Sequence, residues 1–277
     1  MRLALCGDDF EKPMSPDLYF ALTLVVKMAV TAAFLLAATI TAERAGPLIG
    51  GLVATLPISA GPVYIFLALD HDAQFIAQSA LGSLVTNAYN IIFAFSYAVL
   101  AQRSSLLVSF GAAFGVWIAL TWAGGFVFWT LTSAILLNIG VVSVLLWLSA
   151  PLRHAPMPRV ETRWYDLVLR ATMVALLVGV VVTLSFRIGP TASGNLAVFP
   201  IVLSSIMIIL HRRVGGPATA AVMANAIIGL GGFAIALLVL IVSAEPLGSA
   251  LALMLALATS IGANLLIYIV RRRLAAT

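Results

Sequence analysis

Two prolines lie deep inside apolar segments, where they change the hydrogen bonding of the backbone. Pro57 and Pro200 each follow the proline of a Gly-Pro pair by ten residues, so each lies about 15 Å into a helix that starts at that pair. A proline in a helix interior removes the bond to the carbonyl four residues back, here at Val53 and Leu196. In hydrocarbon such a carbonyl needs a helix neighbour, a water or a ligand. The prolines therefore predict a substrate-binding site, with a purely structural kink as the alternative.

Amide and hydroxyl side chains are the second group of candidates. An asparagine in the membrane needs hydrogen-bond partners, so these side chains are expected to face the protein interior. Hydrogen bonding between helices explains any single one, but Asn87 and Asn225 are favoured as a binding pair because both follow the proline-containing segments. Ser193 and Asn195, just before Pro200, are also substrate-binding candidates. The whole group is Asn87, Tyr89, Asn90, Asn138, Ser193, Asn195, Asn225 and Asn264.

Four basic residues could contact an anionic solute. Lys27 and Arg170 are the only two within apolar segments, and they predict either substrate binding or side chains that extend to the nearby membrane surface. Arg44 and Arg187 come directly before the Gly-Pro helix starts. They are candidate gate residues, helped by the positive end of the helix dipole, or ordinary interfacial arginines.

The residues needed for catalysis are missing from the apolar segments. All ten acidic residues and all three histidines lie in termini, loops or segment ends, and no nucleophile, phosphate-binding or metalloprotease motif occurs. Asp70-His71-Asp72 has metal-ligand residue types, but a solvated turn is the preferred interpretation. We expect neither an enzyme nor a cofactor or metal site.

The composition identifies the elements that must position these residues. Of 277 residues, 62% are apolar and only 9% are charged, against about 25% charged in soluble domains. This excludes a soluble enzyme and a nucleic-acid-binding protein, and it predicts an all-α, polytopic transmembrane bundle whose main partner is the lipid bilayer. The single cysteine, Cys6, excludes an internal disulfide.

Charges, prolines and glycines divide the chain into nine predicted spans. The 46 uncharged residues from 104 to 149 are too long for one span, and Gly124-Gly125 between two tryptophans predicts a tight hairpin there. An eight-span chain is the alternative. The predicted spans are 18–42, 47–69, 75–102, 104–123, 126–149, 165–186, 190–210, 217–243 and 247–270.

The loop charges predict the orientation. In the nine-span arrangement ten Lys and Arg residues lie on the side of the C-terminus and three on the side of the N-terminus. Because positive loops stay in the cytoplasm, we expect a multi-pass inner-membrane protein with a cytoplasmic C-terminus and a periplasmic N-terminus.

An internal repeat appears at an offset of 143 residues. Gly46, Pro47 and Pro57 then match Gly189, Pro190 and Pro200, and Lys27 matches Arg170. The two motifs are five spans apart, so the predicted repeats are inverted, as in many secondary transporters. The expected organisation is an N-terminal segment (1–17), repeat 1 (18–123), a linking helix (126–149), a cytoplasmic loop (150–164), repeat 2 (165–270) and a cytoplasmic tail (271–277).

One half of the chain resembles the small GlpM-type inner-membrane proteins. The resemblance rests on Ala45-Gly46-Pro47 through Pro57-Ile58 and the polar turn and helix that follow, over about 45–100, with a fainter echo at 188–240. It implies two such four-span units fused in opposite orientation, and it carries no catalytic residues.

The repeat and the interrupted helices predict a function. We expect a transporter or permease for a neutral, amphiphilic or anionic small molecule, without a proton relay through the bundle. A membrane subunit that scaffolds a cell-envelope enzyme is the alternative. Gly111-x3-Gly115 predicts a helix–helix contact and also allows a homodimer.

Overall fold

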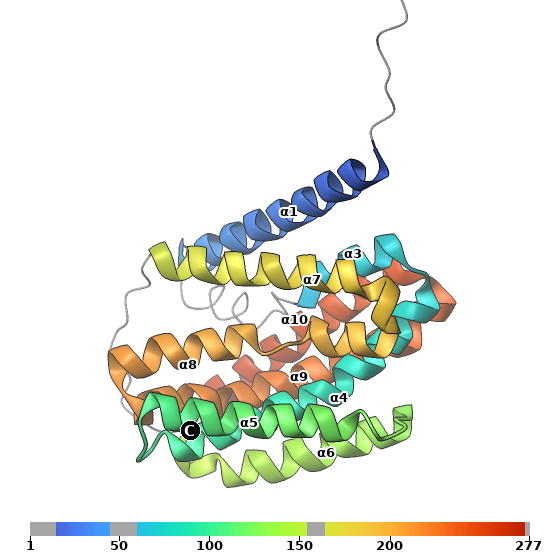
Figure 1. Cartoon of the computed structure of the whole chain (residues 1–277). Helices are drawn as coiled ribbons and strands as arrows, with labels where there is room; N and C mark the ends of the chain where they lie inside the picture. The colour runs from blue at the N-terminus through green and yellow to red at the C-terminus, as the bar shows by residue number, and fades with distance from the viewer. Residues whose placement is uncertain (1–14, 45–59, 154–163, 275–277) are drawn as a thin grey trace, which may run out of the picture.

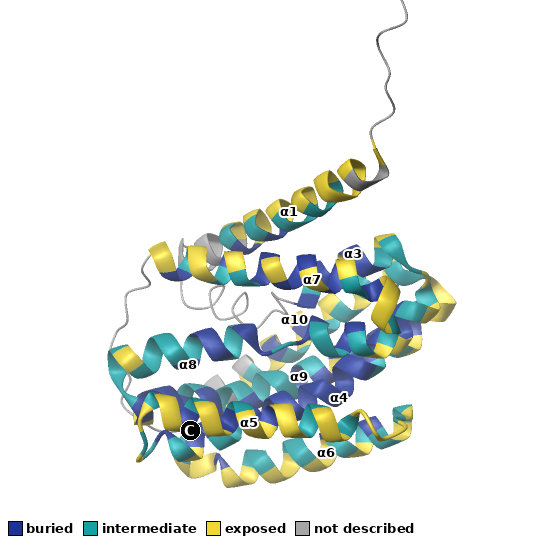
Figure 2. Ribbon diagram, in the orientation of Figure 1, coloured by how far each residue is buried: buried dark blue, intermediate teal, exposed yellow. Residues whose placement is uncertain are grey.

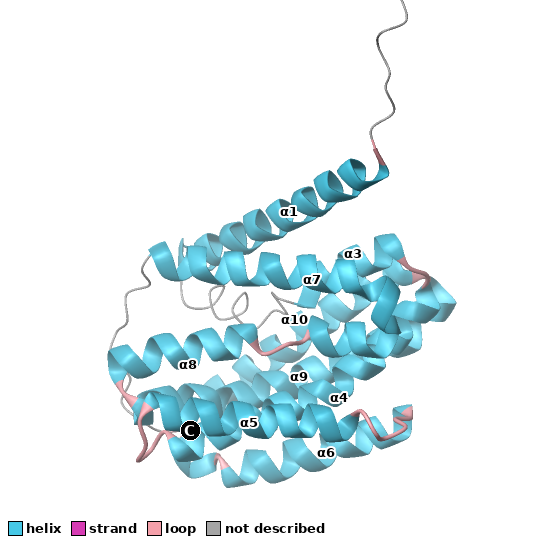
Figure 3. Cartoon of the chain, viewed as in Figure 1, coloured by secondary structure: helices cyan, strands magenta, loops and turns pink. Residues whose placement is uncertain are grey.

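The computed structural model describes residues 15–44, 60–153 and 164–274, and this part of the chain contains helices and no strands (Figures 1 and 3). Seven helical segments in it are long and apolar enough to cross a membrane. The protein is therefore an all-α, multi-pass membrane protein. The helices are α1 (Pro16–Arg44), α3 (Ala60–Asp70), α4 (Ala73–Leu100), α5 (Leu106–Gly124), α6 (Leu131–Leu148), the 3-10 helix η1 (Ala150–Leu152), α7 (Trp164–Ala197), α8 (Ile201–Val214), α9 (Gly216–Leu247) and α10 (Ser249–Leu274).

The predicted hairpin in the long uncharged segment is confirmed. Helix α5 ends at Gly124 and α6 begins at Leu131. The indole Nε1 of Trp129 donates to the Gly124 carbonyl at 2.9 Å, which satisfies one of the carbonyls at the end of α5. Thr130 caps α6, since its hydroxyl accepts from the Ser133 backbone N–H. A glycine pair and a capping threonine thus reverse the chain where the sequence predicted it.

Helix α7 contains a chain reversal at Gly189, where φ is +77°, a backbone conformation that glycine adopts without strain. Before this residue, Asp166 contacts Arg213 of α8 and Ser185 contacts His71 at the start of α4. After it, residues from 190 to 211 follow α4 from its beginning to its end. The first part of α7 and the segment formed by 190–197 and α8 therefore run in opposite directions.

The second of these segments is interrupted as the sequence predicted. Residues 190–197 are helical, residues 198–200 are not, and α8 begins at Ile201 directly after Pro200. The predicted continuous boundaries of 190–210 are thus replaced by two shorter helices that end at 197 and 214. The corresponding break at Pro57 lies outside the described residues.

Helix α4 forms the centre of the bundle, and α9 and α7 pack along it. Of the apolar window of α4, 72% is buried, against 11% in α6, so α4 lies inside and α6 faces outward (Figure 2). A Cβ atom on Gly194 would collide with the Ser79 carbonyl, and one on Gly82 would lie 2.5 Å from the Thr191 carbonyl. These two glycines let the backbones of α4 and residues 190–197 approach closely.

The small-residue motif Gly111-x3-Gly115 on α5 does not bring two described helices close together. Gly111 and Gly115 are exposed, and no atom of another described helix lies within 4 Å of a Cβ placed on either. The predicted contact with another helix of this chain is therefore wrong for the described residues. The tight crossings are made instead by Gly82, Gly194 and Gly216, which are not spaced as a repeated small-residue motif.

Candidate functional site

A ladder of hydroxyl groups on α4 binds residues 190–197. The Ser79 hydroxyl donates to the Pro190 carbonyl at 3.0 Å and the Ser83 hydroxyl to the Gly194 carbonyl at 2.7 Å. One turn further along, Thr86 lies 3.0 Å from the side-chain amide of Asn195. Positions spaced by three or four residues share one face of a helix. The sequence thus places three hydroxyl groups on the face of α4 that receives the interrupted segment.

The break at 198–200 is held by Asn90. Its Nδ2 donates to the Val198 carbonyl at 2.8 Å, and its Oδ1 accepts from the Trp117 indole of α5 at 2.8 Å. Asn90 is 4% exposed, so these bonds form away from solvent. The Leu196 carbonyl, predicted to be bare, accepts from the Phe199 N–H instead. The prediction was wrong by two residues because a tighter turn satisfies Leu196 and leaves Val198 for a side chain.

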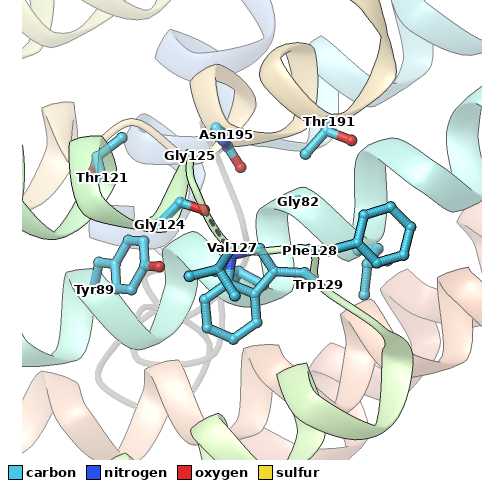
Figure 4. A pocket seen from close by; sticks show the side chains of 12 residues that line it. Gly82, Tyr89, Thr121, Gly124, Gly125, Val127, Phe128, Trp129, Thr191 and Asn195 are labelled. Carbon is cyan, nitrogen blue, oxygen red and sulfur yellow. Dashed lines mark hydrogen bonds between the residues drawn. The ribbon is translucent and has the colours of Figure 1, made fainter.

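A pocket of about 180 Å³ lies between α4, the α5–α6 turn and residues 190–197 (Figure 4). No charged side chain lines it. Aromatic residues and glycines make up half of its lining, and hydroxyl and amide groups come from α4, α5 and residues 190–197. The lining residues are Leu81, Gly82, Val85, Tyr89, Thr121, Gly124, Gly125, Val127, Phe128, Trp129, Thr191 and Asn195.

Tyr89 carries the polar group that this pocket leaves unsatisfied. Its side chain is 6% exposed, and its hydroxyl has no hydrogen-bond partner among the described residues. Figure 4 shows the hydroxyl directed toward the turn that contains Val127 and Trp129. The hydroxyl oxygen is accessible from the pocket, so a molecule bound there can hydrogen-bond to it.

Asn195 supplies a second polar group. Its amide is best satisfied when the nitrogen donates to the Gly82 carbonyl at 2.9 Å and the Thr191 carbonyl at 3.2 Å. Tyr89 therefore brings a hydroxyl group, and Asn195 an amide group, to the same pocket.

The sequence-predicted substrate residues are only partly brought together. Asn195 lines the pocket and Pro200 ends the helix break, whereas the Ser193 hydroxyl donates to the Gly189 carbonyl of its own helix at 2.7 Å. Asn87 is fully buried and donates to Asn138 of α6 and to the Leu230 carbonyl of α9.

The second member of the predicted pair lies elsewhere. Asn225 donates to the Arg153 carbonyl at 3.3 Å and to Ala221 of its own helix, and neither Asn87 nor Asn225 lines the pocket. Both asparagines connect neighbouring helices or stabilise a helix locally. Pro57 lies outside the described residues, so its place relative to the pocket is not described.

Lys27 and Arg170 do not lie beside each other. Lys27 pairs with Asp70 at 2.6 Å, which connects α1 to the end of α3. The next residue, Met28, contacts Gly179, and nine residues of helix, about 14 Å, separate Gly179 from Arg170. Arg170 has an interaction of its own.

The two predicted gate residues lie at helix ends. Arg44 is the last residue of α1, and Arg187 is exposed at the chain reversal before Gly189. Neither lines the pocket.

The residues of the Asp70-His71-Asp72 turn have separate partners. His71 hydrogen-bonds Ser185 at 2.8 Å and stacks on Phe75, and partial burial lowers the pKa of its imidazole. Asp72 accepts from the Phe75 N–H and caps α4. Among the residues that the structure describes, no group of three His, Cys, Asp or Glu side chains is arranged to hold a metal.

Sequence reasoning named two of the lining residues, Tyr89 and Asn195, from their polarity within apolar segments. It missed Thr191, Thr121 and Trp129. The signal for Trp129 was present, since the predicted hairpin places it beside Gly124. The signal for Thr191 was its spacing of four residues from Asn195, which puts both on one helix face.

Searches against protein-family models, curated proteins and solved structures find no match to this chain. The resemblance to the GlpM-type proteins therefore stays a prediction, and the function is argued from the geometry alone.

Proposed function

We propose that this chain is a transporter that carries a small solute across the inner membrane through the pocket beside Asn195. The observation that carries the proposal is the coincidence of an interrupted helix with a pocket whose Tyr89 hydroxyl lacks a partner. Helices broken within the membrane, with a polar group left for a ligand, are typical of transporter sites. A scaffold subunit needs neither feature.

Two ion pairs support the inverted repeats and the nine crossings that belong to this proposal. Lys27–Asp70 joins the first helix of repeat 1 to the end of its second helix, and Asp166–Arg213 does the same in repeat 2. Positions 70 and 213 correspond at the offset of 143 residues. Each repeat thus has one ion pair between its first helix and the end of its second, although position 27 corresponds to 170 and not to Asp166.

The two ion pairs lie at opposite ends of α4. Asp70 comes just before His71 at its beginning, whereas Arg213 follows His211, whose ring bonds Tyr97 near its end. From residue 71 to residue 97, a helix rises about 39 Å, more than the hydrocarbon thickness of about 30 Å. This separation favours one pair on each membrane face and an antiparallel relation of the repeats.

The first prediction concerns access to the pocket from both sides of the membrane. In a Cys6→Ser background, we expect Thr191→Cys to react with a membrane-impermeant maleimide in intact spheroplasts and also in inverted vesicles. A transporter must expose its binding site to each side in turn.

Two control positions fix the sides. Phe126→Cys, on a 77% exposed side chain of the α5–α6 turn that does not line the pocket, should react only in spheroplasts. Ser105→Cys, at the opposite end of α5, should react only in inverted vesicles. Labelling of Thr191→Cys from one side only, or from neither, would contradict transport and favour the scaffold function.

A further inference from the structure

We infer that the pocket binds an uncharged molecule about the size of one aromatic ring with a hydrogen-bonding substituent; this inference rests on the proposed function in treating the pocket as the substrate site. From the sequence, a neutral, amphiphilic or anionic solute was expected; this inference excludes the anionic one. The charge, the size and the polar groups of the pocket each restrict the ligand.

The pocket lining carries no charge, which disfavours an ionic ligand. None of the lining side chains is charged, and none of the four basic candidates from the sequence lines the pocket. Burying an ion without a partner costs several kcal/mol. Lys27, one of the residues that suggested an anion, is already paired with Asp70.

The helix dipole of residues 190–197 does not replace a basic side chain. Thr191 and Asn195 both line the pocket and are four residues apart, so the pocket lies along the side of this helix. The free N–H groups that attract anions project from the end of a helix, not from its side. The pocket therefore has no charged side chain to bind an anion.

Size and polarity set the remaining limits. A cavity of about 150 Å³ holds benzene, so the present pocket, with about 180 Å³, admits one ring and a small substituent. Phe128 and Trp129 provide aromatic surface for that ring. The Tyr89 hydroxyl can donate to an acceptor of the substituent and can accept from a donor. A primary amide carries both groups on one carbon.

Three probes of nearly equal shape separate the charge classes: benzamide, which is neutral, benzoate, an anion, and benzamidine, a cation. We expect benzamide to bind the purified full-length protein in detergent, measured by saturation-transfer NMR and by the shift in melting temperature. Benzoate and benzamidine should bind at least about tenfold more weakly, because each must lose its hydration without a counter-charge. Equal or tighter binding of either ion would overturn the inference, as would the absence of binding by benzamide.

Two variants assign the binding to this pocket. Tyr89→Phe removes only the hydroxyl, so benzamide should bind about 2–10-fold more weakly, while Tyr19→Phe on the exposed face of α1 should leave its affinity unchanged. Prior labelling of Thr191→Cys with N-ethylmaleimide should abolish binding. Full binding to both the Tyr89→Phe and the labelled protein would show that the ligand binds elsewhere.

The outcome is independent of the transport test. Binding is measured at equilibrium in detergent, whereas transport is judged from two-sided labelling in membranes. Selective benzamide binding together with labelling of Thr191→Cys from one side only would reject transport and support the uncharged ligand class. Labelling from both sides together with preferred binding of benzoate would support transport and reject the uncharged ligand class.

Discussion

Gly194→Ala is expected to destabilise the protein by about 1–3 kcal/mol, although alanine favours a helix over glycine by about 1 kcal/mol. The added Cβ would collide with the backbone carbonyl of Ser79, which cannot rotate away as a side chain can. Helix α4 and residues 190–197 would have to separate, and the Ser83 hydrogen bond to the Gly194 carbonyl would lengthen. The melting temperature of the purified protein in detergent measures the effect.

Gly111→Ala is the matched control, because this glycine is also helical but no atom of another described helix lies within 4 Å of the added Cβ. Its helix propensity should act alone, so the melting temperature should stay equal or rise. A Gly194→Ala protein as stable as the Gly111→Ala protein would mean that α4 and residues 190–197 are not closely packed.

The secondary structure was predictable where the sequence marks it with special residues. Gly124-Gly125 and Thr130 fix the α5–α6 hairpin, and Pro200 fixes the start of α8, because each residue acts on its own backbone. The reversal at Gly189 was predicted as a boundary between two spans, and its glycine conformation agrees with that boundary.

The packing partners were less predictable. Gly111-x3-Gly115 has the spacing of a packing motif but faces outward, whereas the isolated glycines 82 and 194 make the close crossing. Spacing along one helix says which residues share a face; it does not say which face meets another helix. That choice depends on the arrangement of the whole bundle.

In the candidate site, too, the sequence predicted some residues correctly and could not predict the surroundings of others. Tyr89 and Asn195 were recognisable as polar groups that must face inward. Asn87 and Asn225 look equivalent in the sequence, but they lie in different surroundings, next to α6 and next to Arg153. A repeat can preserve a residue without preserving its neighbours, so matched positions alone did not identify the pocket.

Asn90→Leu is the second substitution with a large expected effect, because one side chain satisfies two buried groups. Without its amide, both the Val198 carbonyl and the Trp117 indole N–H lose their partner. At about 1–3 kcal/mol for each unsatisfied buried group, the free energy of unfolding should fall by about 2–6 kcal/mol. The melting temperature and the folded fraction on size-exclusion chromatography measure this loss.

Thr259→Val is the control for removing a polar group from a membrane helix. Its exposed hydroxyl donates only to Leu255 of its own helix, so its loss should leave the melting temperature almost unchanged.

Asn90→Asp separates the hydrogen bond that Asn90 accepts from Trp117 from the one that it donates to Val198. The carboxylate can still accept from Trp117 but repels the Val198 carbonyl, so Asn90→Asp should also be destabilised. If Asn90→Leu has the same melting temperature as Thr259→Val, other contacts hold the break before Pro200. Asn90 is then not the residue that positions the interrupted helix beside the pocket.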